Sequence, residues 1–297
     1  MSHADRALGV LDLERLYAAL MRRAVRAARQ GEQVFGVITP SQSRFTVEAG
    51  AYDRPGQAAG PSPMELMLAS LATCAGATLE TVIARMRFAL AGLNVVAEAE
   101  RAERPPRVYT SIDLEFHVAS EAPEERVRHA LEVTEKTCSA SAMLGRVTDI
   151  STRLVHVRRV PAGDTLALRQ RVLRPHQTIA ELAVESESPG AVWYAAMDGG
   201  NVVGTVGVLP EESPDSPAVT PMRLRAMATA DEMRGRGLGS VILSAVLDHA
   251  RRQSSDLLWC AARASAVAFY RRAGFRPTSE PFDVPHIGPH VRMALVP

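Results

Sequence analysis

Apolar positions change period several times along the first half of the chain, and each change predicts a new element. Residues 11–30 place leucines three and four positions apart and end before Gly31, which predicts a helix. Residues 33–39 and 43–50 are predicted short strands, and residues 53–61, rich in Gly and Pro, a loop. From residue 63 to about residue 90, apolar side chains recur around much of a helical circumference, so we expect a central, buried helix.

A capping signal marks the start of that long helix. Ser62 occupies the predicted N-cap position, Pro63 the first helical position and Glu65 the third. Cys74 lies in the middle of the helix. The elements that follow are strands over 93–102 and 107–119, a helix from Pro123 to Lys136, Cys138 just past its end, a short helix SASAML that Ser139 could cap, and a strand over 149–159. This mixture indicates an α+β domain.

The pattern changes at residues 160–165, a short Pro/Gly linker. A strand pair over 191–209 turns at Asp198, Gly199 and Gly200, and a polar loop over 210–221 leads to a strand over 222–229. A glycine-rich turn and a helix over 241–253 come next. We therefore expect two domains, residues 1–159 and residues 160–297, the second an α/β domain with a mixed central sheet.

Composition narrows the function classes. The 297 residues carry a formal net charge of +1, which provides no long-range field for nucleic acid or an anionic membrane. No uninterrupted apolar run approaches a membrane span, and the acidic N-terminus does not resemble a secretory signal. The three cysteines lack CxxC spacing, so we expect no disulfide framework and no metal site. Cytoplasmic localisation is expected.

The most specific motif lies between a predicted strand and a predicted helix. Its glycines let backbone N–H groups point into one pocket, where the helix N-terminus adds partial positive charge, so it can bind a pyrophosphate. It is neither a Walker loop nor a Rossmann fingerprint. The motif consists of Arg234, Gly235, Arg236, Gly237, Leu238 and Gly239.

This motif resembles the R/Q-x-x-G-x-G/A motif of the GNAT acetyltransferases, and residues 261–275 resemble the closing helix of that family. The resemblance spans about residues 165–297 and implies acetyl-CoA as donor and a small-molecule or protein amine as acceptor. It implies that residues 234–239 bind the pyrophosphate and that Tyr270 protonates the leaving thiolate. The strand residues implied to bind the pantetheine arm are Ala226, Met227 and Ala228.

Other positions of the second domain stay open. Arg263 stands where the family often has Asn, a position implied to contact pantetheine. The general base cannot be identified from the sequence: Glu232 is a candidate by proximity, with a solvated loop carboxylate as the alternative. His290 is a candidate substrate contact, with a structural or surface histidine as the alternative. Cys260 is interpreted as a core residue.

Cys74 can be a core residue or a reactive thiol. Its helix, followed by Cys138 64 residues later, resembles the OsmC/Ohr superfamily over about residues 33–158. The resemblance implies that Cys74 attacks a hydroperoxide, that Cys138 resolves the sulfenic acid to a disulfide, and that a dithiol reductant reopens it. It also implies a homodimer. The alternative is a catalytically degenerate binding or dimerisation module.

One departure bears on that choice. The peroxidases have Glu directly after the helix-opening Pro, where this chain has Met64, and Glu65 is one position later. An activating arginine is also expected in the peroxidases. Arg44 and Arg54 are the candidates here.

Overall fold

The computed structural model describes residues 25–297 except 32–33, 40, 42 and 50–56. The chain divides into two compact units, residues 1–70 and residues 71–297. The boundary expected at residues 159/160 stays a prediction. Most of the helix predicted over 11–30 lies outside the described residues. Residues 26–30 belong to a strand, so the helix prediction is wrong there, because pairing with the next strand overrides a weak local preference.

The first unit contains a three-stranded antiparallel sheet. Its strands are β1 (Arg26–Gly31), β2 (Val34–Ile38) and β3 (Arg44–Glu48), in that order, as predicted for the second and third. Helix α2 (Pro63–Arg85) starts with the predicted capping box. The Ser62 amide donates to Glu65 Oε2 at 2.6 Å, and the Glu65 amide donates to Ser62 Oγ at 3.2 Å.

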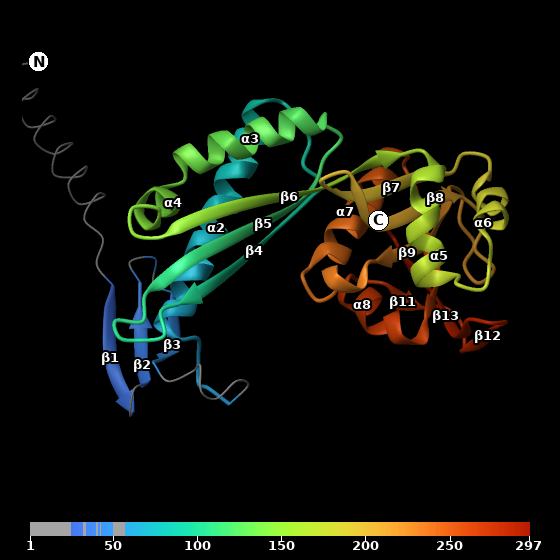
Figure 1. Cartoon of the computed structure of the whole chain (residues 1–297). Coiled ribbons are helices and arrows are strands. Elements are labelled where there is room, and N and C mark those ends of the chain that lie inside the picture. Colours follow the sequence, from blue (N-terminus) through green and yellow to red (C-terminus); the bar gives the residue numbers. More distant parts are fainter. Residues whose placement is uncertain (1–24, 32–33, 40, 42, 50–56) are drawn as a thin grey trace, which may run out of the picture. The chain divides into compact units, whose positions relative to one another are not determined.

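The second unit is organised on a large mixed sheet (Figure 1). Across the described residues the order is β11-β13-β10-β9-β8-β7-β6-β5-β4, with β12 on β13. β5 pairs with β6, and β9 with β10, in parallel; the other pairs are antiparallel. The strands are β4 (Gly92–Arg101), β5 (Tyr109–Ala119), β6 (Asp149–Val160), β7 (Val192–Asp198), β8 (Asn201–Pro210), β9 (Pro221–Thr229), β10 (Leu257–Arg263), β11 (Arg276–Pro277), β12 (Phe282–Val284) and β13 (Gly288–Leu295).

Helix α2 ends earlier than residue 90. The Phe88 amide bonds to the Ile83 carbonyl and the Arg87 amide to the Ala84 carbonyl, with Arg87 left-handed at φ 62°, which is a Schellman-type C-cap. The sequence predicts a central, buried helix, but the structure buries one face of it and leaves the opposite face exposed. Within the described residues, α2 is long and apolar enough to cross a membrane, a test that core helices also pass. Its buried residues are Leu71, Ala75, Gly76, Leu79 and Ile83.

The remaining helices flank the sheet. Cys138, rather than Ser139, occupies the N-cap position before the short helix SASAML, because the chain turns there directly out of the preceding helix. The helices are α3 (Glu124–Thr137), α4 (Ser139–Leu144), α5 (Leu166–Leu173), α6 (Ile179–Ser186), α7 (Leu238–Arg252) and α8 (Val267–Arg272). Helix α7 contacts β4 to β9, and its Ile242 lies in a core with Val157, Tyr194 and Leu224. Strand β6 pairs with β7 (Val157 opposite Ala196), so the sheet is continuous across residue 160.

Candidate functional site

Strands β9 and β10 separate in the middle of the sheet. Their parallel pairing ends at Leu224 opposite Cys260, although both strands continue. Just beyond, β9 carries one extra residue relative to β8, and Ala226 has φ 51°. Such a bulge bends the strand and leaves backbone groups outside the ladder. The separation and the bulge therefore open a gap in the sheet.

A cavity of about 120 Å³ lies at this gap, and Tyr270, Met227, Ala226 and Arg263 line it. Tyr270 is buried, and its hydroxyl donates to the Met227 sulfur at 3.5 Å. Burial, and secondarily Cys260, raises the pKa of Tyr270 well above its ordinary value. The hydroxyl therefore keeps its proton at neutral pH and can donate it. Ala228, the third predicted strand residue, is buried and does not line this cavity.

A second cavity of about 150 Å³ shares lining residues with the first. Arg225, Ala226 and His290 belong to both. The second cavity is also lined by Arg169 of α5 and Glu185 of α6. The two cavities are thus neighbouring parts of one cleft, one part at the tyrosine and the other between α5, α6 and β9.

His290 is buried, and its hydrogen bond to the Gly288 carbonyl determines which ring nitrogen carries the hydrogen. Its Nδ1 lies 2.7 Å from the Gly288 carbonyl oxygen, which can only accept, so Nδ1 carries the hydrogen. The neutral ring then presents Nε2 as an acceptor. Glu232, the candidate base named from the sequence, is exposed and lines neither cavity. His290 lines both.

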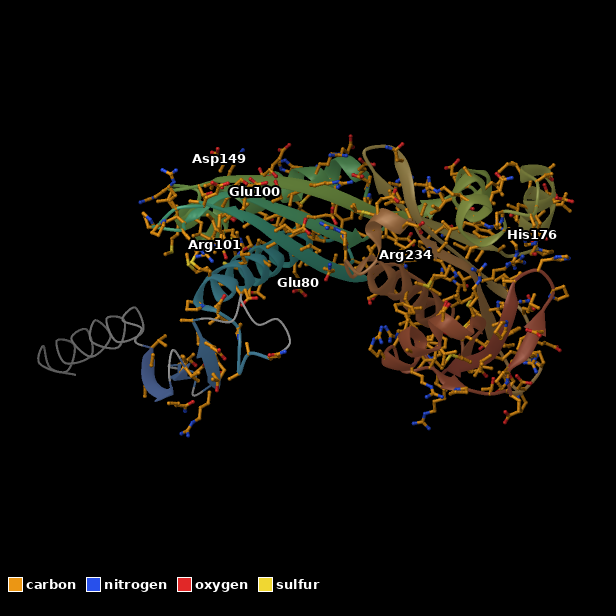
Figure 2. The ribbon with its side chains drawn as sticks, turned by 60° about the horizontal axis from the view of Figure 1, so that its bottom comes forward. Glu80, Glu100, Arg101, Asp149, His176 and Arg234 are labelled. Atoms are coloured by element: carbon orange, nitrogen blue, oxygen red, sulfur yellow. The ribbon has the colours of Figure 1, made fainter. Side chains whose placement is uncertain are left out.

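The glycine-rich motif forms the turn between β9 and α7. Gly235 and Gly237 have φ 76° and 83°, the left-handed region that favours glycine. Gly237 is the N-cap of α7, whose first amides have no carbonyl one turn earlier. Arg234, labelled in Figure 2, pairs with Asp231 at 2.7 Å. The turn offers an amide cradle at a helix N-terminus, the arrangement that binds phosphate.

Arg236 holds this turn to strands β4 and β5. Its guanidinium donates to Glu98 at 2.8 and 3.0 Å and to Glu115 at 3.0 Å. These hydrogen bonds raise the pKa of Arg236. The side-chain amide nitrogen of Asn94 donates to the Arg236 backbone carbonyl at 3.0 Å. The side chain of Arg236 is therefore committed to protein partners, which leaves the backbone of the turn for a ligand.

Four arginines of the second cavity are not among the residues predicted from the sequence. Arg263, predicted to contact pantetheine, lines the Tyr270 cavity and donates to the Leu173 carbonyl at 2.7 Å. Four further arginines line the second cavity: Arg169, Arg174, Arg223 and Arg225. The alternation Arg-Leu-Arg over 223–225 is a signal that both side chains share one face of a strand, but only the fold shows that α5 covers that face.

Cys74 and Cys138 come together across 64 residues. The Cys74 thiol hydrogen-bonds to the Cys138 sulfur, and neither forms a disulfide. Burial raises the pKa of Cys138, but hydrogen bonds from Ser141, Cys74 and the Ala140 amide outweigh it, so the pKa is lowered. Cys138 is fully buried, whereas Cys74 is half-buried. Cys260 is a buried core residue, and burial raises its pKa to about 12.

None of the residues considered as activators of Cys74 is placed beside it by the described structure. Glu65 belongs to the capping box, and hydrogen bonds from Ser62 lower its pKa. Arg44 is exposed on β3, and Arg54 lies outside the described residues. The causes that lower the pKa of Cys138 are hydrogen bonds. Among the described residues, no group of three or more His, Cys, Asp or Glu side chains could hold a metal ion.

Comparison with known proteins identifies both regions. The OsmC-like protein model matches residues 56–153, and the acetyltransferase (GNAT) family model matches residues 164–275. The uncharacterized N-acetyltransferase YitI of Bacillus subtilis is 28% identical over 141 residues, 47% of this chain and 95% of YitI. Protein YhfA of Escherichia coli is 30% identical over 93 residues, 31% of this chain and 69% of YhfA.

Among solved structures, an OsmC-like protein from Mycoplasma pneumoniae aligns with a TM-score of 0.42 and 20% identity, over 46% of this chain and 96% of that one. The two family matches follow one another in the order expected from the two motifs. The chain is a fusion of an OsmC-like domain with a C-terminal domain of the GNAT acetyltransferase family.

Proposed function

We propose that the C-terminal domain transfers an acetyl group from acetyl-CoA to an amine. The observation that carries this proposal is the cavity at the separation of β9 and β10, where a buried, protonated Tyr270 lies beside the strand bulge. The amide cradle of residues 234–239 suits a pyrophosphate, and a Cβ built on Gly235 would meet no atom within 4 Å, so the backbone at Gly235 is open to a ligand.

The residues support direct transfer. His290 Nε2 takes a proton from the acceptor ammonium, and the free amine attacks the thioester carbonyl. A C–N bond forms as the C–S bond breaks, and the Tyr270 hydroxyl gives its proton to the departing thiolate. After the C–N bond forms, the nitrogen loses one more proton to solvent and keeps the other. His290 releases its proton to solvent, and solvent returns Tyr270 to its protonated form. The products are an acetamide and CoA thiol.

A screen of amines with acetyl-CoA, read by release of the CoA thiol and by product mass, tests this proposal. His290→Gln should lower kcat at neutral pH by about 100-fold, within the range for a general base. His129→Gln is the matched control, because that histidine is exposed on α3. Binding of acetyl-CoA without transfer to any amine would reject the proposal.

For the N-terminal domain we propose thiol-dependent reduction of organic hydroperoxides. The supporting observation is the hydrogen bond from the Cys74 thiol to the buried Cys138 sulfur, which brings the two sulfurs together. The half-buried Cys74 is the sulfur that a peroxide can reach. The Cys74 thiol loses its proton to solvent, and the thiolate attacks the peroxide. The O–O bond breaks, a sulfenic acid forms, and the leaving alkoxide takes a proton from solvent to become an alcohol. The Cys138 thiol then condenses with the sulfenic acid, releasing water, and a dithiol reduces the disulfide.

Consumption of an organic hydroperoxide in the presence of a dithiol tests this activity. Cys74→Ser should abolish it, whereas Cys260→Ser should leave it unchanged, because Cys260 is a separate core residue. Mass spectrometry of peroxide-treated protein should find a Cys74–Cys138 disulfide. Equal turnover by Cys74→Ser would favour the alternative, a binding or dimerisation module.

We also propose that the chain forms a homodimer through the OsmC-like domain and acts in the cytoplasm. A groove of about 620 Å³ runs between α2 and β4, lined by small and apolar residues such as Ala72, Gly76, Ala77 and Leu93. A face of this kind can pack closely against a second helix.

A further inference from the structure

The second cavity of the C-terminal domain gathers positive charge. Arg223 and Arg225 alternate with the buried Leu224, so both extend from the same face of β9. Arg169 comes from α5 and Arg174 follows its end. The chain as a whole has a net charge of only +1, so this concentration is local.

Arg169 is a buried cation with neutral partners. It is 2% exposed, its Nη1 donates to the Ser186 hydroxyl at 2.5 Å, and its guanidinium carbon lies 4.3 Å from the centre of the Trp193 ring. Across the described part of the chain it makes no ion pair. Burial lowers its pKa to about 10, so it remains charged at neutral pH. An uncompensated buried charge is costly unless a counter-charge arrives.

The carboxylates nearby do not neutralise the cluster. Glu211 is paired with Arg223 at 2.6 Å. Glu185 Oε2 lies 3.9 Å from Arg225, and its other oxygen accepts from the Gln177 amide at 2.6 Å. Glu185 is thus the carboxylate nearest to Arg225, and it also acts on Arg169 and Arg174. Burial lowers the pKa values of Arg174 and Arg225, and neighbouring arginines add to the lowering.

The donor does not account for these arginines. The amide cradle proposed for the pyrophosphate is at residues 234–239, and none of those residues lines either cavity. The cluster adjoins the Tyr270 cavity on the side of α5 and α6. It therefore lies where an acceptor would enter to meet the thioester.

We infer that the acceptor is a small amine that also carries a carboxylate, such as an amino acid. This inference rests on the proposed acetyltransferase function. A planar carboxylate can take two parallel hydrogen bonds from a guanidinium and supply the missing charge at Arg225 and its neighbours. A short amino acid would then present its amine toward His290, which lines both cavities.

Matched acceptor pairs test the inference. Each amino acid is compared with its carboxamide, which keeps the amine and removes the negative charge, and kcat/KM is read by CoA release. The carboxamide amine is less basic, so more of it is deprotonated and the intrinsic bias favours the amide. We expect the acid to be preferred by about 100-fold, the effect of a charge-assisted pair. The pair phosphoethanolamine and ethanolamine is run alongside.

Arg225→Gln should lower kcat/KM for the acid by about 10- to 100-fold and lower that for the carboxamide much less. Arg276→Gln, an exposed arginine on β11, is the control and should change nothing. Three outcomes would overturn the inference and leave acetyl transfer itself intact. They are equal kcat/KM for acid and carboxamide, an equal loss of kcat/KM for both in Arg225→Gln, and a preference for phosphoethanolamine. Bound acetyl-CoA with no compound acetylated would reject the acetyltransferase proposal and the inference together.

Discussion

The Tyr270 hydroxyl lies 3.5 Å from the Met227 sulfur, across the gap where β9 and β10 separate. A thioether is a weak acceptor, so this hydroxyl gains little from its protein partner and can be turned to a ligand at small cost. In this contact the hydroxyl lies next to Met227, the residue that follows Ala226 in the bulge.

Tyr270→Phe should lower kcat about 100-fold, within the range for general acid catalysis, with the Kd for acetyl-CoA unchanged. The ring stays in place, so the loss is chemical. Tyr194→Phe is the control, because that tyrosine is also buried but bonds to Glu121 and lines neither cavity of the cleft. Steady-state rates and calorimetry measure the two quantities. Similar kcat values for wild type and Tyr270→Phe would contradict the assignment.

Gly237→Ala should weaken acetyl-CoA binding and destabilise the fold by at least about 1–2 kcal/mol, the cost of a left-handed non-glycine residue. A Cβ at Gly237 would lie 2.8 Å from Asn94 Nδ2, and Asn94 is held by its bond to the Arg236 carbonyl.

Gly235→Ala is the control that separates backbone strain from steric crowding at Gly237. Gly235 has a similar φ, but a Cβ added there would meet no atom within 4 Å. Its loss in free energy of unfolding, measured with denaturant, should therefore be the smaller of the two. An equal loss would show that the Asn94 contact does not matter.

Stability should fall below neutral pH because of His156. Burial lowers the pKa of His156 below 6.5, and Arg158 adds to the lowering. The hydrogen bond to the Ser120 carbonyl at 2.9 Å and the charge of Glu124 offset part of this effect. The unfolded chain binds the proton at a higher pH than the folded chain, so the stabilisation is full above pH 6.5 and lost below it.

Replacing His156 by Gln should flatten the dependence of the unfolding free energy on pH between 7 and 5, by up to about 1.4 kcal/mol per pH unit. Denaturant titrations at each pH measure this slope. The exposed His129→Gln variant should keep the wild-type slope. Parallel curves for wild type and His156→Gln would refute the explanation.

Ala77→Arg should convert the proposed dimer to a monomer. Ala77 is exposed on α2 and lines the groove with β4, so a long charged side chain there blocks close helix packing. Light scattering should give twice the 32.0 kDa chain mass for wild type and the single mass for the variant. A wild-type monomer would remove the proposed role of this groove.

Features that depend only on neighbouring residues can be predicted from the sequence. The capping box of Ser62 and Glu65 and the glycine turn before α7 are predicted correctly, because each depends on neighbouring residues. A second capping box, Thr178 with Glu181, carries the same signal and is absent from the predictions. Strand β1 is predicted wrongly, because its pairing with β2 outweighs helix periodicity.

Contacts between distant segments cannot be predicted from the sequence in the same way. The cluster joins Arg169 to Arg225, and Glu185 lies between them in sequence, yet only the packing of α5 on β9 brings them together. The Cys74–Cys138 spacing indicates a pair, but the hydrogen bonds that lower the pKa of Cys138 come largely from the turn at Ser141.

The pairing of β6 with β7 has a practical consequence for dissecting the protein. A truncated chain that starts at residue 160 would lack β6 and leave the edge of β7, including Trp193 and Tyr194, without its partner strand. Bare strand edges invite association with other chains. The acetyltransferase half should therefore tend to associate when it is expressed alone from residue 160, and a chain that begins before β6 should not.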